Sequence, residues 1–401
     1  MHQSVAVGYR PGDTEYRRIS VGLFAAGMAT FALLYSTQPL LPELADAFHV
    51  SPSQSAISMS VATLGLGLAL LIAGNISERI GRITLMRWSV AACSAIALLC
   101  AFAPTWNTLL VLRGLQGIAM AGLPAVAMAY LREEVHSASH ARASGLYVAG
   151  TGVGSMTGRL IAGALEDLGG WRLALAGVAL LGAACAVAVW MLLPASRNFV
   201  PRSARPRAQF GSVLRDPGLL ALYAMAATVV GGFVAVYNGA VFRLTDSPYS
   251  LSSGATGLVF TVYLLGSFSS ATAGRLADRF GRRAVVPVGG VVALVGVAVT
   301  LAAPLPLIVL GLALLTAGFF AVHGVGSGWV PARAHAAGVG TGQASSMYLF
   351  SFYLGSSVFG GLAGTAWSRA GWSGVALEAG VLFAIALVLS LVLKAVPRLD
   401  G

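Results

Sequence analysis

The chain has 401 residues, of which 57% are hydrophobic and only 10% charged, whereas soluble domains average about 45–50% apolar and about 25% charged residues. Together with a mean hydropathy of +0.81, this balance excludes a soluble protein. The formal net charge of +11 could suggest a nucleic-acid partner, but so apolar a chain has too little polar surface for a basic domain, and no such partner is predicted. The charges are better interpreted by the side of a membrane on which each one falls. No Cys or His spacing resembles a zinc or haem site, so no metal or other cofactor is expected.

Twelve segments have the roughly 20 apolar residues that a bilayer-spanning helix needs. They predict an all-α membrane protein with 12 transmembrane helices, at residues 19–41, 54–74, 84–103, 107–131, 141–165, 172–193, 218–242, 253–274, 284–303, 306–330, 341–366 and 372–395. The first span follows basic residues without a small-residue cleavage site, so we expect a signal anchor rather than a removable signal peptide.

The distribution of Arg and Lys sets the predicted orientation. Placing both termini inside leaves 20 of the 25 basic residues on the cytoplasmic side, because only three fall outside and two within spans: Arg172, Arg243 and Arg369, then Arg113 and Arg159. Cytoplasmic loops of membrane proteins carry this kind of excess. A multi-pass protein of the bacterial inner (cytoplasmic) membrane is therefore expected, with the lipid bilayer as its surroundings.

The longest polar stretch divides the chain nearly in half. Residues 194–217 hold five arginines and four prolines, which favours a basic cytoplasmic linker. The predicted organisation is a cytoplasmic tail at 1–18, a six-helix bundle at 19–193, this linker, a second six-helix bundle at 218–396, and a cytoplasmic tail at 397–401.

The two halves repeat one another at an interval of about 200 residues. The stretch from Gly74 to Arg82 after the second span matches that from Gly274 to Arg282 after the eighth, and Tyr147 matches Tyr348 at an offset of 201. Two related six-helix halves are typical of secondary transporters, in which the halves rock about a site near mid-membrane.

The duplicated loop sequence G-x-x-x-[D/E]-R-x-G-R resembles a signature of the major facilitator superfamily, found there after helix 2 and again after helix 8. The resemblance covers the whole chain. Residues 31–42, 158–160 and 343–350 are also similar to a bacterial branch of inner-membrane efflux permeases, of the drug:proton antiporter kind. This resemblance implies the major facilitator fold and alternating access.

In similar transporters the loop signature latches the cytoplasmic side while the outer side is open. The latch candidates are the glycines, which allow close approach and turns, with the charged residues between them: Gly74, Glu78, Arg79, Gly81, Arg82, Gly274, Asp278, Arg279, Gly281 and Arg282. Topogenic charge alone also explains these arginines. Glu78 stands where the family usually has Asp, which leaves the geometry of the first latch open.

Two arginines fall inside predicted spans, where a buried charge is costly and marks a functional candidate. Arg113, with Gln116 and Gly117, resembles the superfamily's helix-4 signature, in which the Arg is tied to proton or substrate coupling; a helix-bridging role is the alternative. Arg159 lies in a glycine-rich helix that departs from the family's antiporter signature, because Ser155 replaces its Pro. Arg159 is expected either to pair with Glu166 or Asp167 or to face the cavity.

Titratable groups for proton coupling are scarce. Glu378 is the one acid clearly within a span, and His323 is the one intramembrane group that titrates near neutral pH without help. Both are coupling candidates with Arg113 and Arg159. A structural histidine that only hydrogen-bonds, and a Glu378 that faces an outer vestibule, are the alternatives.

By resemblance, helices 1, 4, 7 and 10 line the cavity. The residues they offer are polar anchors among aromatics and methionine, which suit an amphipathic organic molecule: Tyr35, Gln38, Gln116, Met120, Tyr237, Asn238, Phe319 and Phe320, together with Arg113 and His323. Ordinary helix packing accounts equally well for such a stripe.

The leading hypothesis is a secondary active transporter, functional as a monomer, that exports a small organic substrate such as a drug or metabolite with the proton gradient as its energy source. Uptake of a sugar, an amino acid or an organic anion is the alternative, in which Arg113 and Arg159 hold a carboxylate. A non-transporting membrane receptor is more distant. The chain has no protease, hydrolase or nucleotide-loop motif, so neither an enzyme nor an ATP-driven pump is predicted.

Overall fold

The computed structural model describes residues 8–199 and 210–396, and these are helical apart from turns and one isolated bridge between Tyr9 and Val135. The tail at 397–401 and the middle of the predicted linker lie outside the described residues, as do Arg202, Arg205, Arg207 and Arg398. The described start of the linker is anchored to the first half, because the amides of Arg197 and Asn198 donate to Glu134 Oε1 over 2.9 and 3.0 Å.

The first half contains seven α-helices and one short 3-10 turn in the described residues. In chain order these are α1 (Thr14–Tyr35), α2 (Leu41–Phe48), α3 (Pro52–Ile80), α4 (Arg82–Ala101), α5 (Trp106–Met120), α6 (Gly122–Glu134), η1 (Ser137–Ser139) and α7 (His140–Leu192).

The second half has corresponding spans after a short linker helix, but they are divided differently into elements. Its elements are α8 (Phe210–Val213), α9 (Pro217–Thr245), α10 (Ser253–Val259), η2 (Phe260–Leu264), α11 (Leu265–Phe280), α12 (Arg282–Val299), α13 (Leu305–Ala336) and α14 (Thr341–Ala395). The described chain places helix α1 from Thr14 onward, so the end of the predicted N-terminal tail at 1–18 is helical.

Ten helical stretches of the described chain are long and apolar enough to cross a membrane. Two of them, α7 with 53 residues and α14 with 55, are each broken by non-helical residues, at Gly169 and Gly170 and at Ala370 and Gly371. Gly170 and Gly371 have φ values of 75° and 56°, which glycine adopts without strain. Each long helix is therefore two antiparallel spans, and the predicted count of twelve follows.

The first span differs from its prediction at its outer end. It was expected to run to residue 41, but α1 ends at Tyr35, and five residues in turns precede α2. Pro39 lacks an amide to donate, and in a continuous helix its ring would clash with the carbonyl of Tyr35, so the helix stops there. This break brings polar residues 36–38 into the middle of the molecule.

Close helix packing within each half depends on small residues. Gly150, Gly154 and Gly158 bring α7 against α1 so tightly that a Cβ on any of them would lie 2.2–2.4 Å from a carbonyl oxygen of α1. In the second half Gly355 of α14 lies equally close to α9. Lipid offers no hydrophobic force between helices, so such close contact is how spans associate in a bilayer.

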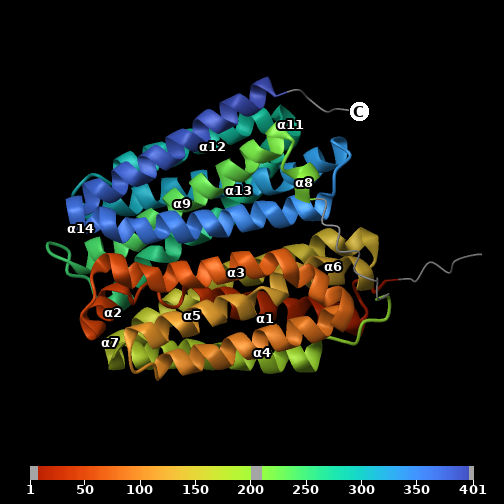
Figure 1. Ribbon diagram of the computed structural model, residues 1–401, viewed down its shortest axis with the longest axis horizontal. Coiled ribbons are helices and arrows are strands. Elements are labelled where there is room, and N and C mark those ends of the chain that lie inside the picture. Colours follow the sequence, from red (N-terminus) through yellow and green to blue (C-terminus); the bar gives the residue numbers. More distant parts are fainter. Residues whose placement is uncertain (1–7, 200–209, 397–401) are drawn as a thin grey trace, which may run out of the picture.

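Figure 1 shows the two halves as separate bundles side by side, with α1 to α7 in one and α9 to α14 in the other. Their main contacts are α14 with α3 and α7 with α10. One buried apolar cluster lies in the second half and one in the first, and a third lies mainly in the first half but includes Phe242 and Tyr353 of the second. The two bundles thus meet along a few helices.

Candidate functional site

Arg159 lies near the centre of the molecule, with a side chain only 1% exposed. Its Nε donates to Gln38 Oε1 over 2.6 Å, and its Nη1 donates to the Ser155 carbonyl over 2.7 Å. The guanidinium carbon lies 4.2 Å from the ring centre of Tyr35 and 4.8 Å from that of Tyr263. Cation–π contacts of this kind stabilise a desolvated guanidinium.

The environment of Arg159 separates the two predicted alternatives. None of the ion pairs among the described residues involves Arg159, and Asp167 instead accepts hydrogen bonds from Ser252 Oγ and the Gly254 amide. The proposed pairing with Glu166 or Asp167 is therefore wrong for this conformation. Arg159 points to the interface between the two halves, where Tyr263 of the second half covers it.

A chain of hydrogen bonds continues from Arg159 across that interface. Gln38 Nε2 donates to Asn238 Oδ1 over 2.7 Å, and Asn238 Nδ2 donates to the Gly360 carbonyl over 3.0 Å. Gln38 and Asn238 belong to different halves and are both 1% exposed. The two amides thereby link the turn after α1 with α7, α9 and α14.

Arg113 has a different environment, because its partners belong to its own half. Its Nη1 and Nη2 donate to the carbonyls of Leu33 and Leu34 over 3.1 and 2.9 Å, and its Nε donates to the Ser58 carbonyl over 3.3 Å. The carbonyls at the end of α1 have no partners within the helix. Arg113 thus caps the break in the first span, with Gln116 Oε1 at 2.6 Å as a further acceptor.

The remaining predicted cavity residues divide between the two halves. Gln116 donates to the Cys93 carbonyl and Met120 is fully buried in the core of the first half. Tyr237 lies within hydrogen-bonding distance of Thr316, at 2.7 Å, inside the second half. The proposed cavity set is therefore not one contiguous lining in this conformation.

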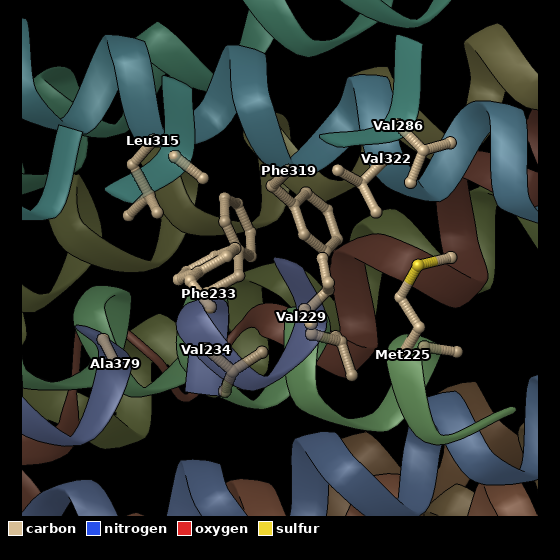
Figure 2. Packing of buried hydrophobic residues seen from close by; sticks show 14 of the residues in the cluster. Met225, Val229, Phe233, Val234, Val286, Leu315, Phe319, Val322 and Ala379 are labelled. Carbon is tan, nitrogen blue, oxygen red and sulfur yellow. The ribbon is translucent and has the colours of Figure 1, made fainter. Parts of the chain in front are cut away.

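Aromatic side chains form a continuous cluster in the second half. The rings of Phe233 and Phe319 stack with their centres 4.0 Å apart, and Phe320 meets Phe319 edge-on with 4.9 Å between ring centres. Figure 2 shows Phe233 and Phe319 beside Met225, Val229 and Val322 in this region. The His323 ring stacks on Phe319 with 5.7 Å between ring centres, and its centre lies 4.6 Å from that of the Phe352 ring.

The latch residues are mostly held within their own half. Arg82 bonds to Glu133 Oε1 over 3.1 and 3.2 Å, lies 3.7 Å from Glu78, and also donates to Ser77 Oγ. In the second copy Arg279 lies over the ring of Phe280, while Asp278 and Arg282 form no ion pair among the described residues.

The glycines of the latch behave in two ways. Gly81 and Gly281 have φ values of 93° and 85° and form the turns between spans. Gly74 and Gly274 were expected at close helix approaches, yet a Cβ on either would meet nothing within 4 Å. The cytoplasmic ends of α3 and α11 are thus not packed tightly at these positions.

Contacts between the halves gather at the opposite, outer ends of the helices. Ser53 and Thr365 hydroxyls lie 2.7 Å apart, Ser357 Oγ donates to the Ser60 carbonyl over 2.7 Å, and Asp167 accepts from Ser252 over 2.7 Å. A Cβ on Gly364 would lie 2.5 Å from the Pro52 carbonyl. The described chain is therefore closed on its predicted outer side.

Glu378 lies apart from these groups. Neither of its carboxylate oxygens has a hydrogen-bond partner among the described residues, and both are covered from solvent. Its helix, the second part of α14, packs against α9 and α12, away from the link between Gln38 and Asn238.

A buried ion pair that the sequence analysis missed joins the cytoplasmic ends of α9 and α13. Arg333 Nε and Nη2 bond to the two oxygens of Asp216 over 2.5 and 2.9 Å. Burial alone raises the pKa of the Asp216 carboxyl, but Arg333 and the Leu219 amide outweigh it and hold the pKa below its ordinary value. Stability from this pair is present above the ordinary pKa and is lost as the pH falls through the lowered one.

Other missed residues at the centre are Tyr263, Phe233, Tyr348 and Phe352. Tyr263 lies on helix 8, and Tyr348 and Phe352 lie on helix 11, neither of which was among the expected cavity helices. Phe233 lies on helix 7, which was expected to line the cavity, but it was not selected there. The only signal in the sequence was the density of Phe and Tyr in these segments.

Comparison with known proteins decides the family. The family model for the Major Facilitator Superfamily matches residues 20–253. The inner membrane transport protein YnfM of Escherichia coli K12 is 41% identical over 380 residues, which cover 94% of this chain and 90% of that protein. The chain belongs to the Major Facilitator Superfamily.

Other relatives agree with this membership of the superfamily. The uncharacterized MFS-type transporter YybF of Bacillus subtilis is 39% identical over 385 residues, which cover 95% of this chain and 94% of that one. Among solved structures, an inward-facing, occupied bacterial homologue of the human lysosomal transporter Spinster has a TM-score of 0.76 at 18% identity and covers 97% of this chain and 98% of its own. The predicted all-helical membrane fold is thus confirmed, and the protein is a multi-pass secondary transporter of small molecules.

Proposed function

We propose that this transporter carries a small organic anion, with Arg159 as the group that binds the anionic end. The observation that carries the proposal is the buried guanidinium of Arg159, which has no carboxylate partner among the described residues. A charge held inside a membrane protein is costly without an opposite charge. A substrate carboxylate would supply that charge and accept two parallel hydrogen bonds from the guanidinium.

The same residues argue against a cationic drug as the substrate. The acids with enclosed carboxylate oxygens that lack a hydrogen-bond partner among the described residues are Glu133 and Glu134, at the cytoplasmic end of α6, and Glu378, in the second part of α14, and none of them forms an ion pair with Arg159. The aromatic rings that flank Arg159 belong to Tyr35 and Tyr263. A cation would therefore meet a fixed positive charge at the centre and no acid to balance it.

Electrical work favours export as the direction. A membrane that is negative inside drives an anion outward by about 2.3 kcal/mol per charge for each 100 mV. Uptake of the same anion would need a co-transported proton or another cation. We therefore propose efflux, with exchange for a proton as the coupling to be tested.

The test uses purified protein and inside-out vesicles that contain it. Organic acids, cationic dyes and sugars are compared for thermal stabilisation, since a ligand that binds only the folded state raises its stability. Arg159→Gln is expected to lower the affinity for acids about tenfold or more, as loss of a charged hydrogen-bond pair of about 1.5–3 kcal/mol implies. Arg159→Lys should retain part of it.

Arg172→Gln is the matched control, because Arg172 lies over Trp171 at an outer helix turn, away from the centre. It should leave acid binding unchanged. Stabilisation by cations but not acids, or full acid binding by Arg159→Gln, would overturn the proposal. In inside-out vesicles, accumulation of acid under an imposed potential tests the direction of transport. Accumulation under an imposed pH gradient tests the exchange for a proton.

A further inference from the structure

Two side-chain amides, those of Gln38 and Asn238, join the halves at the centre of the molecule. Their hydrogen bond is 2.7 Å long, and both side chains are 1% exposed. The other hydrogen bonds between the halves, among the described residues, join more exposed side chains or reach a backbone carbonyl. The contact between these amides is therefore a deeply buried side-chain link across the surface along which the halves separate.

The two amides occupy corresponding places in the sequence repeat. Gln38 and Asn238 lie 200 positions apart, and each bonds to the long helix at the end of its own half. Gln38 accepts from Arg159 of α7, and Asn238 donates to the carbonyl of Gly360 of α14, 201 positions beyond Arg159. Contacts between corresponding residues lie near the axis that relates the two halves, so rocking of one half against the other changes them.

The order of donors and acceptors in this chain of bonds is fixed from both ends. The Arg159 guanidinium can only donate, so it holds Gln38 Oε1 as an acceptor and leaves Nε2 to face Asn238. The Gly360 carbonyl can only accept, so it holds Asn238 Nδ2 as a donor and leaves Oδ1 to face Gln38. Neither amide can turn over without placing two donors or two acceptors against each other.

The two ends of the chain differ in charge. The first half has the cation Arg159 where the second half has Gly360, so an anion can act at one end only. A carboxylate that binds the guanidinium side-on takes the Nε–H group, which Gln38 now holds over 2.6 Å. Gln38 then loses the donor that orients its amide toward Asn238.

We propose that Gln38 and Asn238 are positioning residues of the transport cycle, whose hydrogen bond holds the outer side closed until a substrate carboxylate on Arg159 displaces Gln38. The displacement rests on the proposed function, since it needs an anion at Arg159. The empty carrier then stays closed outside, and the loaded carrier opens. Release of the anion lets the bond form again, which favours return to the closed outer side.

The experiment measures opening of the outer side without any ligand. Ser357→Cys is introduced into the full chain without its three native cysteines, and a membrane-impermeant thiol reagent is added outside intact cells. Ser357 is 7% exposed and donates to the Ser60 carbonyl of the other half, so a cysteine there should react slowly while the outer side is closed. Ser373→Cys, exposed beside the turn at Gly371 on the predicted outer side, reports access of the reagent and should react equally in every variant.

Gln38→Met and Asn238→Leu should each speed the modification of the cysteine at position 357 about three- to tenfold, the value of one hydrogen bond. The double variant should react no faster than the faster single variant, because both substitutions remove the same bond. Thr316→Val is the matched control, because it removes an equally buried hydrogen bond, to Tyr237, that lies within one half. It should lower the midpoint of thermal unfolding and leave the rate of modification unchanged.

Gln38→Glu tests the displacement, because it places a carboxylate on Arg159 within the protein itself. The side chain keeps its length and its contact with the guanidinium, but its second oxygen cannot donate to Asn238 Oδ1. Asn238 cannot turn its amide to compensate, since Oδ1 would then face the Gly360 carbonyl. We expect a folded protein in which the cysteine at position 357 reacts at least as fast as in Gln38→Met.

The results separate this proposal from anion transport. Modification at the rate of the parent chain in both Gln38→Met and Asn238→Leu would overturn the role of the hydrogen bond. Faster modification in these two variants but not in Gln38→Glu would overturn its release by a carboxylate. Acid binding that persists in Arg159→Gln would overturn the proposed function and the release together, and it would leave the closing role of the bond standing.

Discussion

Two arginines that looked alike as intramembrane charges have different partners. Arg113 has four acceptors within its own half, three of them backbone carbonyls. Arg159 has one carbonyl, one amide and two rings, one of which belongs to the other half. The number and kind of acceptors, more than burial, are the basis on which we propose a structural role for Arg113 and a binding role for Arg159.

Arg113→Met should destabilise the protein, because it removes the donor to the buried Leu34 carbonyl at a cost of about 1–3 kcal/mol. The Leu33 carbonyl loses Arg113 but still accepts from Ser36 Oγ over 2.9 Å. A lower midpoint of thermal unfolding in detergent is the expected result, with acid affinity kept in the protein that remains folded. The midpoint of thermal unfolding of Arg113→Lys should lie between those of the unmodified protein and Arg113→Met.

The same variants test the predicted role of Arg113 in coupling. If Arg113→Met is as stable as the unmodified protein but loses substrate-dependent flux, the result would favour a role in coupling over a role in capping the end of α1. Unchanged flux in correctly inserted Arg113→Ala would exclude it.

At the scale of helices, glycines on one face set how closely α1 and α7 approach. Gly154→Ala would place a Cβ 2.2 Å from the Met28 carbonyl oxygen, so the two helices must separate. Overpacking of this kind costs about 1–3 kcal/mol. A reduced unfolding temperature and reduced flux are expected.

Gly145→Ala is the matched control on the same helix, because a Cβ there meets nothing within 4 Å. It should be neutral or slightly stabilising, as alanine is the better helix former. Equal effects of the two substitutions would show that helix propensity, and not the contact with α1, explains the result.

The sequence predicted the helices better than it predicted their interruptions. Long apolar runs identify all twelve spans, because the bilayer imposes the length. The end of the first span was misplaced, since the prediction included Leu40 and Leu41 beyond the polar residues 36–38, although α1 ends at Tyr35, before Pro39. Arg159 and Gln38 were both candidates, but their contact joins residues 121 positions apart, which no local pattern can predict. Tyr263 was missed because its role depends on where the second half docks.

For the whole molecule, the outer contacts predict a closed gate that must open during transport. Ser53→Cys with Thr365→Cys, in a background without Cys93, Cys100 and Cys185, should form a disulfide because the native hydroxyls lie 2.7 Å apart. Oxidation should stop flux, and a reductant should restore it. Each single cysteine variant is the control and should transport in both conditions. Full flux through the oxidised pair would contradict opening at this position.

The placement of Arg113 and Arg159 also makes the carrier sensitive to voltage. Both positive charges belong to the first half, whereas the one arginine among the buried residues of the described second half, Arg333, is neutralised by Asp216 at the cytoplasmic edge. If rocking moves a central charge through about a tenth of the field, 100 mV changes the balance between the two states by about 0.2 kcal/mol. Under the proposed function, a bound carboxylate cancels one of these charges, so the loaded and empty carriers should respond differently to the membrane potential. A transient current on addition of substrate would then report the occupied site.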